Sequence, residues 1–229
     1  MRGRLAALAG VLLIVTGCDW PRDADGTLDR VRGGVLRAGV TESPPWTEIP
    51  DGGEPTGAEA ELVRRLATAL GARVEWYPGT ESALMPALKQ RSLDVVVGGL
   101  DATAPWTQDA SLTRPYLTAR TVVAARPGIA VPDDLDGVRV AVRGGTGDVA
   151  TLAATDADVV EVAEITGAEG IPGVVEDWEL APLGLVGSTH ELGTTDHVWA
   201  VPPGENGWQA EVETFLLNLS HDEIVGLLT

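Results

Sequence analysis

Apolar residues in this chain gather in short continuous runs that are separated by polar turns. The clearest run is Val95–Val97, which leads into Gly98, Gly99, Leu100 and Asp101. A run without polar alternation predicts a strand that is buried on both faces, as in a parallel α/β sheet. Ligands of open α/β sheets bind beyond the carboxyl ends of the strands. Gly99 and Asp101 are therefore candidate ligand contacts, with a plain strand-to-loop exit as the alternative.

The same pattern predicts the other elements of an α/β fold. Apolar strands are predicted at 35–40, 73–77, 121–125, 138–142, 159–162, 174–175 and 195–201. Apolar residues spaced three and four apart predict two longer helices, one through Leu62, Val63, Leu66 and Leu70, the other through Trp208, Val212, Phe215, Leu216 and Leu219. Thr56 and Glu59 have capping-box spacing, so we expect Glu59 to cap the first of these helices.

Two loops, one with prolines and one with glycines, each follow a predicted strand and precede a predicted helix. In the first loop Trp46 follows two prolines, and its ring either joins the core or faces a ligand. The second loop runs from Arg143 through Thr146 and Gly147 to a helix that begins near Asp148. A helix N-terminus beside an arginine can bind an anion. A purely structural glycine turn is the alternative.

The N-terminus has the pattern of an export signal. Arg2 and Arg4 precede the apolar run 5–15, and the small residues Thr16 and Gly17 then lead to Cys18. Cys18 is the only cysteine, so it cannot form an internal disulfide. Its position resembles the lipobox of bacterial lipoproteins, in which the cysteine is lipidated and becomes the mature N-terminus. An ordinary signal peptide with an incidental cysteine is the alternative.

Residues 19–33 are polar, contain proline and glycine and lack an apolar period, so we expect a flexible tether. No run approaches the roughly 20 apolar residues of a membrane-spanning helix. Acidic residues outnumber basic ones by 34 to 16, which argues against a nucleic-acid partner. The 229 residues suit one or two small domains.

Residue patterns of common catalytic and cofactor sites are not found in the sequence. The three histidines lie far from any second metal ligand at a usable spacing, so we expect no metal site. The sequence has no Gly-x-Ser-x-Gly elbow and no dinucleotide fingerprint, and we expect no cofactor. Glu176, Asp177 and Glu179 form an acidic cluster that could supply acid–base groups or hydrogen bonds to a ligand.

Several segments, taken in order, resemble the extracellular solute-binding proteins of bacterial family 3. They are VLRAGVTESPPW, TGAEAELVRRLATALGARVEWYP, LMPALKQRSLDVVVGGLDAT, RPYLTARTVVAARPG and DLDGVRVAVRGGTG. The resemblance implies a two-lobed, periplasmic-binding-protein-like fold, in which two parallel-type sheets flanked by helices are joined by two hinge strands. It places lobe 1 at 34–122 and 200–229, lobe 2 at 128–194, and the hinge at 121–127 and 195–201.

The resemblance also implies a set of ligand contacts. Trp46 matches the aromatic residue that stacks on the ligand, and the other matches are Gly99 and Asp101 in the lobe 1 loop, Arg143, Thr146 and Gly147 in the lobe 2 loop, and Asp177, which takes the ligand's amino group. Trp106 departs from the family pattern, because amino-acid binders carry there an arginine that clamps the ligand carboxylate. With Trp46 opposite, Trp106 would favour a flat or cationic group. Lobe 2 is also short, since relatives place a helix between 165 and 174, and this implies a shallower or open cleft.

These features together predict a monomeric receptor tethered to the membrane by lipidated Cys18. It would deliver a small polar solute, amine-bearing or aromatic, to the permease of an ABC importer from the periplasm or the outer face of the plasma membrane. We expect no enzymatic activity and assign no catalytic residue. The alternatives are an enzyme like the periplasmic cyclohexadienyl dehydratases, with Asp101 and Asp177 as its acid–base pair, and a sensor or interaction module with a degenerate cleft.

Overall fold

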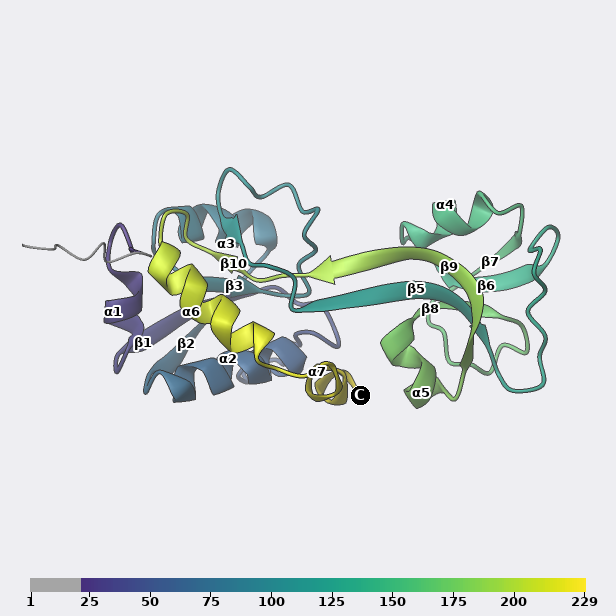
Figure 1. The fold of residues 1–229 in the computed structure, drawn as a ribbon, viewed down its shortest axis with the longest axis horizontal. Helices are drawn as coiled ribbons and strands as arrows, with labels where there is room; N and C mark the ends of the chain where they lie inside the picture. Colours follow the sequence, from purple (N-terminus) through teal and green to yellow (C-terminus); the bar gives the residue numbers. More distant parts are fainter. Residues whose placement is uncertain (1–21) are drawn as a thin grey trace, which may run out of the picture.

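The computed structural model describes residues 22–229, so the predictions for the signal peptide and for lipidated Cys18 lie outside the described residues. The molecule has two lobes joined by two long antiparallel strands, β5 (Leu117–Ala125) and β9 (Val186–His197) (Figure 1). Each lobe contains one five-stranded sheet. The predicted two-lobed α/β fold is confirmed, with the difference that both sheets are mixed rather than purely parallel.

The lobe 1 sheet has the strand order β2-β1-β3-β10-β4. Its parallel part consists of β1 (Val35–Val40), β2 (Arg73–Pro78) and β3 (Val95–Val97), and its antiparallel part of β10 (Ala200–Val201) and β4 (Ser111–Leu112). All three valines of β3 are buried, as the absence of polar alternation predicts. The carboxyl ends of β1 and β3 meet at the sheet edge that faces lobe 2 (Figure 1).

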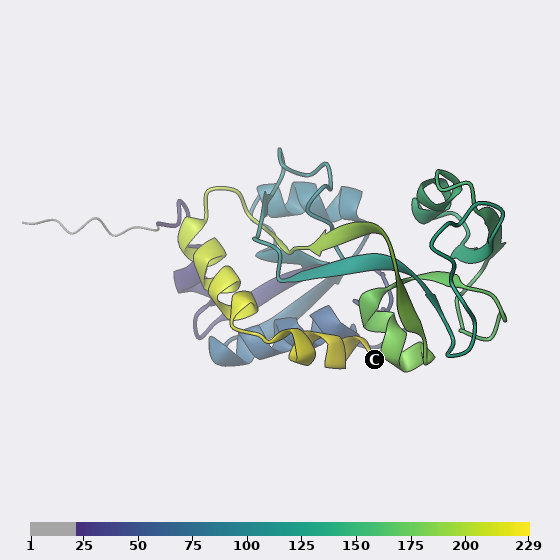
Figure 2. The same cartoon turned by 45° about the vertical axis from the view of Figure 1, so that its right-hand side comes forward.

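Helices cover both faces of the lobe 1 sheet. Helices α2 (Ala58–Ala69) and α3 (Glu81–Lys89) lie on opposite faces, and α6 (Asn206–Leu217) and α7 (His221–Leu228) pack into the same core as α2 (Figures 1 and 2). The predicted apolar faces of α2 and α6 are confirmed by six fully buried side chains, those of Leu62, Val63, Leu66, Trp208, Val212 and Leu216. Their removal from water is the main stabilising contribution to this lobe.

Lobe 2 is smaller and has the strand order β7-β6-β8-β5-β9. Its own strands are β6 (Arg139–Arg143), β7 (Asp158–Val162) and β8 (Gly173–Glu176), and its short helices are α4 (Asp148–Ala153), η1 (Asp177–Glu179) and α5 (Leu180–Leu183). Helices α4 and α5 lie on opposite faces of the sheet (Figures 1 and 2). The ten residues between β7 and β8 form a loop, as their short spacing predicts.

The crossing between the lobes differs from the predicted hinge. Residues 121–124, part of the hinge predicted at 121–127, pair with β8 inside the lobe 2 sheet. The crossing lies earlier on β5, where Leu117 pairs with His197. In the second predicted hinge, 195–201, Ala200 already pairs with Val96 in the lobe 1 sheet. The apolar pattern could not locate this boundary, because Val198 and Trp199, which lie between β9 and β10, are as fully buried as the strand residues that follow them.

The predicted tether at 19–33 contains a folded element. Helix α1 (Thr27–Val31) packs on lobe 1, and Val31 is fully buried in its core. The buried carboxylate of Glu205 accepts hydrogen bonds from the backbone N–H groups of Asp25 and Thr27 at 2.9 and 3.0 Å. The prediction of a flexible segment is therefore wrong for these residues. Their anchoring partner lies 180 positions away from Asp25, where no local pattern reveals it.

Candidate functional site

The glycine turn that follows β3 is held in place by the buried carboxylate of Glu59. One oxygen accepts hydrogen bonds from the N–H groups of Gly98 and Gly99 at 2.7 and 2.8 Å. The other accepts from the hydroxyl of Tyr116 at 2.6 Å and from the indole N–H of Trp199 at 3.0 Å. Gly99 has a φ of 68°, a backbone conformation that favours glycine. A side chain from α2 thus determines where this edge of the site lies.

Glu59 does not have the capping role that its spacing from Thr56 predicts. The N-cap of α2 is Gly57, and no side chain caps this helix. Burial raises the pKa of Glu59, while the hydrogen bonds from Tyr116 and the two glycine amides oppose the rise. The sequence pattern misled because the hydrogen-bond donors to Glu59 lie at least 39 positions away in the chain.

Trp46 lies where the two lobes meet, with 6% of its surface exposed. Its ring stacks on His197 with the centroids 3.9 Å apart, and it meets Trp178 of lobe 2 edge to face at 6.2 Å. A Cβ atom on Gly99 would lie 2.8 Å from the Trp46 ring, so only glycine leaves room for the ring. Trp46 therefore joins lobe 1 to lobe 2, instead of presenting an open face on which a ligand could stack.

His197 lies against Trp46 at the end of β9, and 3% of its surface is exposed. Neither ring nitrogen has a hydrogen-bond partner within residues 22–229. Burial lowers the pKa of His197 to about 4, although Asp101 and Asp196 act in the opposite direction. The ring is therefore neutral at pH 7. The predicted contact Asp101 forms a backbone bridge with His197, and its Oδ1 accepts a hydrogen bond from the N–H of Thr103 at 2.5 Å.

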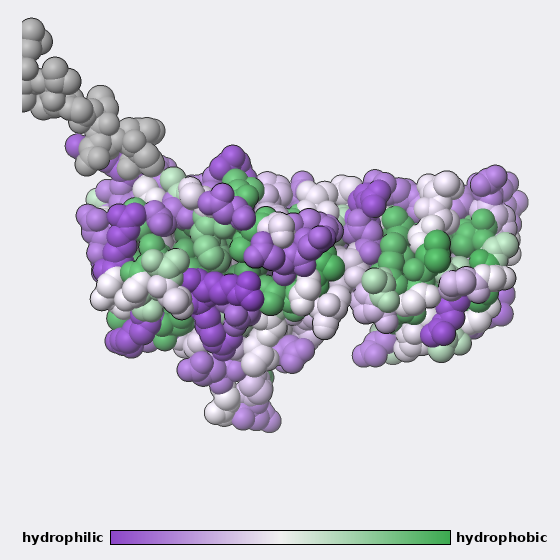
Figure 3. Space-filling view, turned by 60° about the horizontal axis from the view of Figure 1, so that its bottom comes forward, coloured by the Kyte–Doolittle hydropathy of each residue, from purple (hydrophilic) through white to green (hydrophobic). Residues whose placement is uncertain are grey.

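A cavity of about 540 Å³ lies between the lobes, and we call it the interlobe cavity. Lobe 1 contributes one hairpin to the lining, and lobe 2 contributes the end of β6, the loop after β7 and the turn after β8. The lining residues are Ser43, Pro44, Pro45 and Trp46 of lobe 1, and Arg143, Glu164, Ile165, Glu176, Trp178 and Glu179 of lobe 2. On the face drawn in Figure 3, the surface is indented between the two lobes. The lining residues include three carboxylates, one guanidinium and two indoles, so the cavity is polar, acidic and aromatic.

The charged residues of lobe 2 that the sequence singled out are paired within the lobe. Arg143 forms an ion pair with Glu179. Asp177 forms one with Arg120 of β5, with Oδ2 and Nε 2.9 Å apart. Arg143 lines the interlobe cavity, but Asp177 does not. An amine could reach Asp177 only in competition with Arg120.

The two residues that flank Asp177 do line the cavity. The indole N–H of Trp178 donates a hydrogen bond to the carboxylate of Glu176. Burial raises the pKa of Glu176, while this hydrogen bond opposes the rise. Trp178 was missed as a site residue, although its position directly after an acidic pair was visible in the sequence.

The loop after β6 does not bring the three predicted anion contacts, Arg143, Thr146 and Gly147, together in one site. Thr146 and Gly147 are exposed, and neither lines the interlobe cavity. The hydroxyl of Thr146 donates a hydrogen bond to the carbonyl of Arg143 at 2.9 Å. Asp148 opens α4, and burial raises the pKa of its carboxyl group. A carboxylate at this helix start and a guanidinium already paired with Glu179 both disfavour an anionic ligand.

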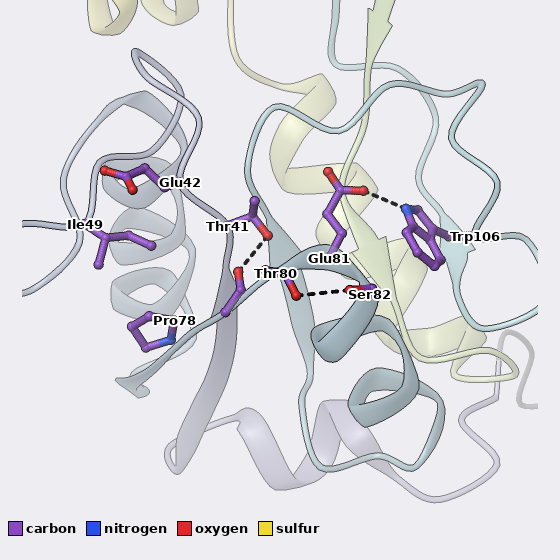
Figure 4. Close-up of a pocket in the computed structure, with 9 residues that line it drawn as sticks. Thr41, Glu42, Ile49, Pro78, Thr80, Glu81, Ser82 and Trp106 are labelled. Carbon is purple, nitrogen blue, oxygen red and sulfur yellow. Dashed lines mark hydrogen bonds between the residues drawn. The ribbon is translucent and has the colours of Figure 1, made fainter.

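Trp106 lies in a second cavity, of about 720 Å³, on lobe 1 (Figure 4). Its indole N–H donates a hydrogen bond to Oε2 of Glu81 at 2.7 Å, and its ring packs against the core on the α3 side of the sheet. The two cavities share no lining residue. The structure therefore does not place Trp106 opposite Trp46.

Between residues 22 and 229, no three or more histidine, cysteine, aspartate or glutamate side chains are grouped as metal ligands would be. No helix in that range has the length and apolar character needed to cross a bilayer.

Comparison with known families identifies the chain. The model of the bacterial extracellular solute-binding proteins, family 3, matches residues 36–227, which include both lobes and both crossing strands. The chain belongs to this family. The interlobe cavity thus lies between the two lobes of a family 3 solute-binding protein.

Among curated relatives, this family 3 protein is 32% identical over 126 residues to the membrane-bound lytic murein transglycosylase F of Photobacterium profundum, a match that covers 54% of this chain and 24% of the relative. It is 29% identical over 104 residues to the ABC transporter arginine-binding protein 1 of Escherichia coli, with 45% and 43% covered. The chain thus spans less than half the length of either relative.

Among solved structures, the family 3 fold is found again with low sequence identity. An ancestral cationic amino acid solute binding protein matches with a TM-score of 0.70 at 23% identity, over 88% of this chain and 97% of the other. The L-cystine solute receptor of Neisseria gonorrhoeae, in its unliganded open conformation, matches with a TM-score of 0.68 at 21% identity, over 86% and 92%. These similarities establish the two-lobed architecture.

Proposed function

We propose that this protein is a receptor that binds a small cationic, amine-bearing solute in the interlobe cavity. The observation that carries the proposal is the set of charges in that cavity. Glu164, Glu176 and Glu179 line it together with one arginine, Arg143, whose guanidinium is already paired with Glu179. An excess of carboxylates in a partly buried cavity favours a positively charged ligand.

The aromatic side chain of Trp178 supports the same ligand class. Its half-buried indole lines the cavity beside Glu176, and an indole attracts cations through the electrons of its ring. A ligand carboxylate, by contrast, meets no unpaired arginine among the lining residues. We therefore infer weak or absent binding of glycine, alanine and glutamate.

We further propose that the receptor delivers its solute to the permease of an ABC importer, and that lipidated Cys18 anchors it as a monomer on the outer side of the cytoplasmic membrane or in the periplasm. The basic and apolar N-terminus and membership in an extracellular family support this location. The similarity to an ABC transporter arginine-binding protein supports the transport role. Detergent-phase partitioning of the unmodified chain and of Cys18→Ser tests the anchor, and equal partitioning would contradict it.

The central experiment is a thermal-shift screen of the full chain in detergent with amines, guanidines, quaternary ammonium compounds, amino acids, sugars and aromatic acids. A ligand present at about 100 times its Kd adds about 2.7 kcal/mol of stability, which such a screen detects readily. We expect stabilisation by amines. Tight binding of glutamate together with no response to any amine would overturn the proposal.

Variants of lobe 2 connect the screen to the cavity. Glu176→Gln should weaken amine binding, because it removes a carboxylate from the lining. Glu161→Gln is the matched control, since Glu161 is an exposed residue of β7 outside the cavity. The raised pKa of Glu176 gives a second test. Because only the ionised carboxylate attracts a cation, amine affinity should rise as the pH rises through this pKa, and the rise should be smaller in Glu176→Gln.

The curated relatives favour one second candidate, a binding module that senses fragments released during cell-wall turnover. Several of those relatives are named membrane-bound lytic murein transglycosylase F, and the matched part covers 18% to 47% of their length. Stabilisation by amine-bearing muropeptides, but not by simple amines, would favour this candidate. The enzymatic alternative has less support, because neither Asp101 nor Asp177 lines the interlobe cavity.

A further inference from the structure

The second cavity, on lobe 1, has its own chemistry. It is lined by the carboxyl ends of β1 and β2, the first turn of α3 and the loop that carries Trp106: Thr41, Glu42, Ile49, Pro78, Gly79, Thr80, Glu81, Ser82 and Trp106. In Figure 4, Glu42 and Ile49 lie on one side of the cavity and Trp106 on the other, with Glu81 beside Trp106. The lining contains two carboxylates and no basic residue.

The pairing of Glu81 with Trp106 prepares one wall for a cation. The indole N–H holds Oε2 of the carboxylate at 2.7 Å, which fixes the side chain without neutralising its charge. No hydrogen bond or ion pair from the described residues 22–229 engages the other carboxylate oxygen. The indole ring is half-buried and adds an aromatic surface next to the negative charge. A carboxylate beside an indole is a combination that suits an ammonium or guanidinium group.

The two cavities meet at one small hairpin. Thr41 and Glu42 line the lobe 1 cavity, whereas the next four residues, 43–46, line the interlobe cavity. The hairpin is closed by reciprocal backbone hydrogen bonds between Ser43 and Thr47 at 2.9 and 3.0 Å, and the Thr47 hydroxyl donates a further hydrogen bond to the carbonyl of Thr41. This hairpin is therefore the part of the protein that a single ligand has to cross in order to reach both cavities.

We propose that the Glu81–Trp106 cavity is a second cation subsite, and that the solute carries two positively charged groups separated by an aliphatic chain, as in a diamine, a polyamine or a guanidino-amine. This inference rests on the proposed function, in which the interlobe cavity binds the first cationic group. The lobe 1 cavity binds the second. Two weak cation sites joined by one ligand act as a bivalent site, because the second group binds at a high effective concentration once the first is bound.

Calorimetry of the full chain in detergent with n-butylamine, 1,4-diaminobutane and spermidine tests the proposal. We expect the diamine or the triamine to bind at least about tenfold more tightly than the monoamine. Glu81→Gln should remove most of this difference and leave the monoamine affinity within about twofold, because the monoamine does not need the second subsite. Trp106→Phe, which keeps an aromatic ring but loses the N–H donor to Glu81, should reduce the difference less.

Glu48→Gln is the matched control, because Glu48 is an exposed glutamate of the neighbouring loop and lines neither cavity. Its titrations should match those of the unmodified protein. Equal binding of monoamine and diamine, or equal weakening of both by Glu81→Gln, would overturn the second subsite and leave the proposed receptor function intact. Failure of all three amines to bind would overturn both proposals.

Discussion

The two lobes use their carboxylates in different ways. In lobe 1, Glu59, Asp94 and Glu205 are at most 1% exposed, and each accepts hydrogen bonds from segments far apart in the sequence. In lobe 2, Glu176 and Asp177 are only half-buried and lie at or beside the interlobe cavity. Lobe 1 thus builds its fold on fully buried acids, whereas lobe 2 places Glu164, Glu176 and Glu179 in the lining of the cavity. We therefore expect substitutions of these buried acids of lobe 1 to affect folding, and substitutions of the acids of lobe 2 that line the interlobe cavity to affect ligand binding.

The largest expected effect is that of Glu59→Ala in lobe 1. This change leaves the donors of Gly98, Gly99, Tyr116 and Trp199 without their acceptor. An unsatisfied buried donor costs about 1–3 kcal/mol, so the free energy of unfolding should fall by about 4 kcal/mol or more. Urea denaturation measures it, with Glu48→Ala as the exposed control. A loss below about 1 kcal/mol would contradict the structural role that we assign to this carboxylate.

Asp94→Asn should be the next most damaging change. The buried Asp94 side chain forms ion pairs with Arg30 at 2.5 Å and with Arg37 at 2.7 Å. Removing one partner from a buried ion pair costs about 3 kcal/mol. Burial alone would raise the pKa of Asp94, but the hydrogen bonds from Arg30 and Arg37 outweigh it and hold the pKa below its ordinary value.

The lowered pKa of Asp94 determines how the effect varies with pH. The stabilisation by the ionised group is complete above the pKa of the unfolded chain, about 4, and is lost as the pH falls through the lower pKa of the folded state. Denaturation midpoints of the unmodified protein and of Asp94→Asn should therefore differ most near neutral pH and converge in acid. A difference that stays constant between pH 7 and pH 2 would argue against the ionised pair.

Gly99→Ala should reduce stability by an intermediate amount. It should also affect ligand binding, because Gly99 lies against Trp46, which contacts lobe 2. The φ of 68° is unfavourable for alanine, and the new Cβ would lie 2.8 Å from the Trp46 ring. We expect a loss of about 1–3 kcal/mol. We also expect weaker amine binding, because a displaced Trp46 changes its contact with Trp178. Urea denaturation measures the loss of stability, and calorimetry of the same sample measures the amine affinity. Unchanged stability with unchanged affinity would contradict the packing described for Trp46.

Arg143→Gln in lobe 2 should have the smallest effect on stability. The Arg143–Glu179 ion pair is partly exposed on the arginine side, and such pairs contribute less than about 1 kcal/mol. Amine affinity should increase by about threefold to tenfold, because the substitution removes the one positive charge from the cavity lining. A weaker binding of amines would show instead that Arg143 contacts an anionic part of the solute.

The sequence was most informative where the physical cause is local. The valine run of β3 and the apolar faces of α2 and α6 were predicted correctly, because burial on one or both faces leaves a periodic pattern. The site was harder. Trp46 and Arg143 line the interlobe cavity, and their contact with a ligand stays a prediction, whereas Trp106 lies in a different cavity.

The remaining errors have a common physical reason. Glu59 and Glu205 bind backbone groups that are remote in the chain. Spacing rules therefore assigned Glu59 to a helix cap, and they did not reveal that Glu205 anchors the segment around α1. The predicted Asp177 contact depends on Arg120, a residue of the crossing strand that no motif singled out. Which charged side chains pair in the folded protein cannot be predicted from the spacing of residues in a single sequence.

If Cys18 is lipidated as we propose, the docking of α1 limits the distance between lobe 1 and the membrane. The carbonyl of Arg22 accepts a hydrogen bond from the N–H of Asn206, and Ala24 is bound to Gly204, so lobe 1 holds the chain from residue 22 onward. Three residues then separate Cys18 from Arg22. The four peptide units between them reach at most about 14 Å, against roughly 20–25 Å for a free coil over the whole of 19–33. Because α1 lies at the end of the molecule farthest from lobe 2 (Figure 1), a lipidated molecule would be pinned by its larger lobe, with the smaller lobe pointing away from the bilayer. Such a molecule would reach a permease by lateral and rotational diffusion in the plane of the membrane. It would not tumble freely at the end of a long flexible tether.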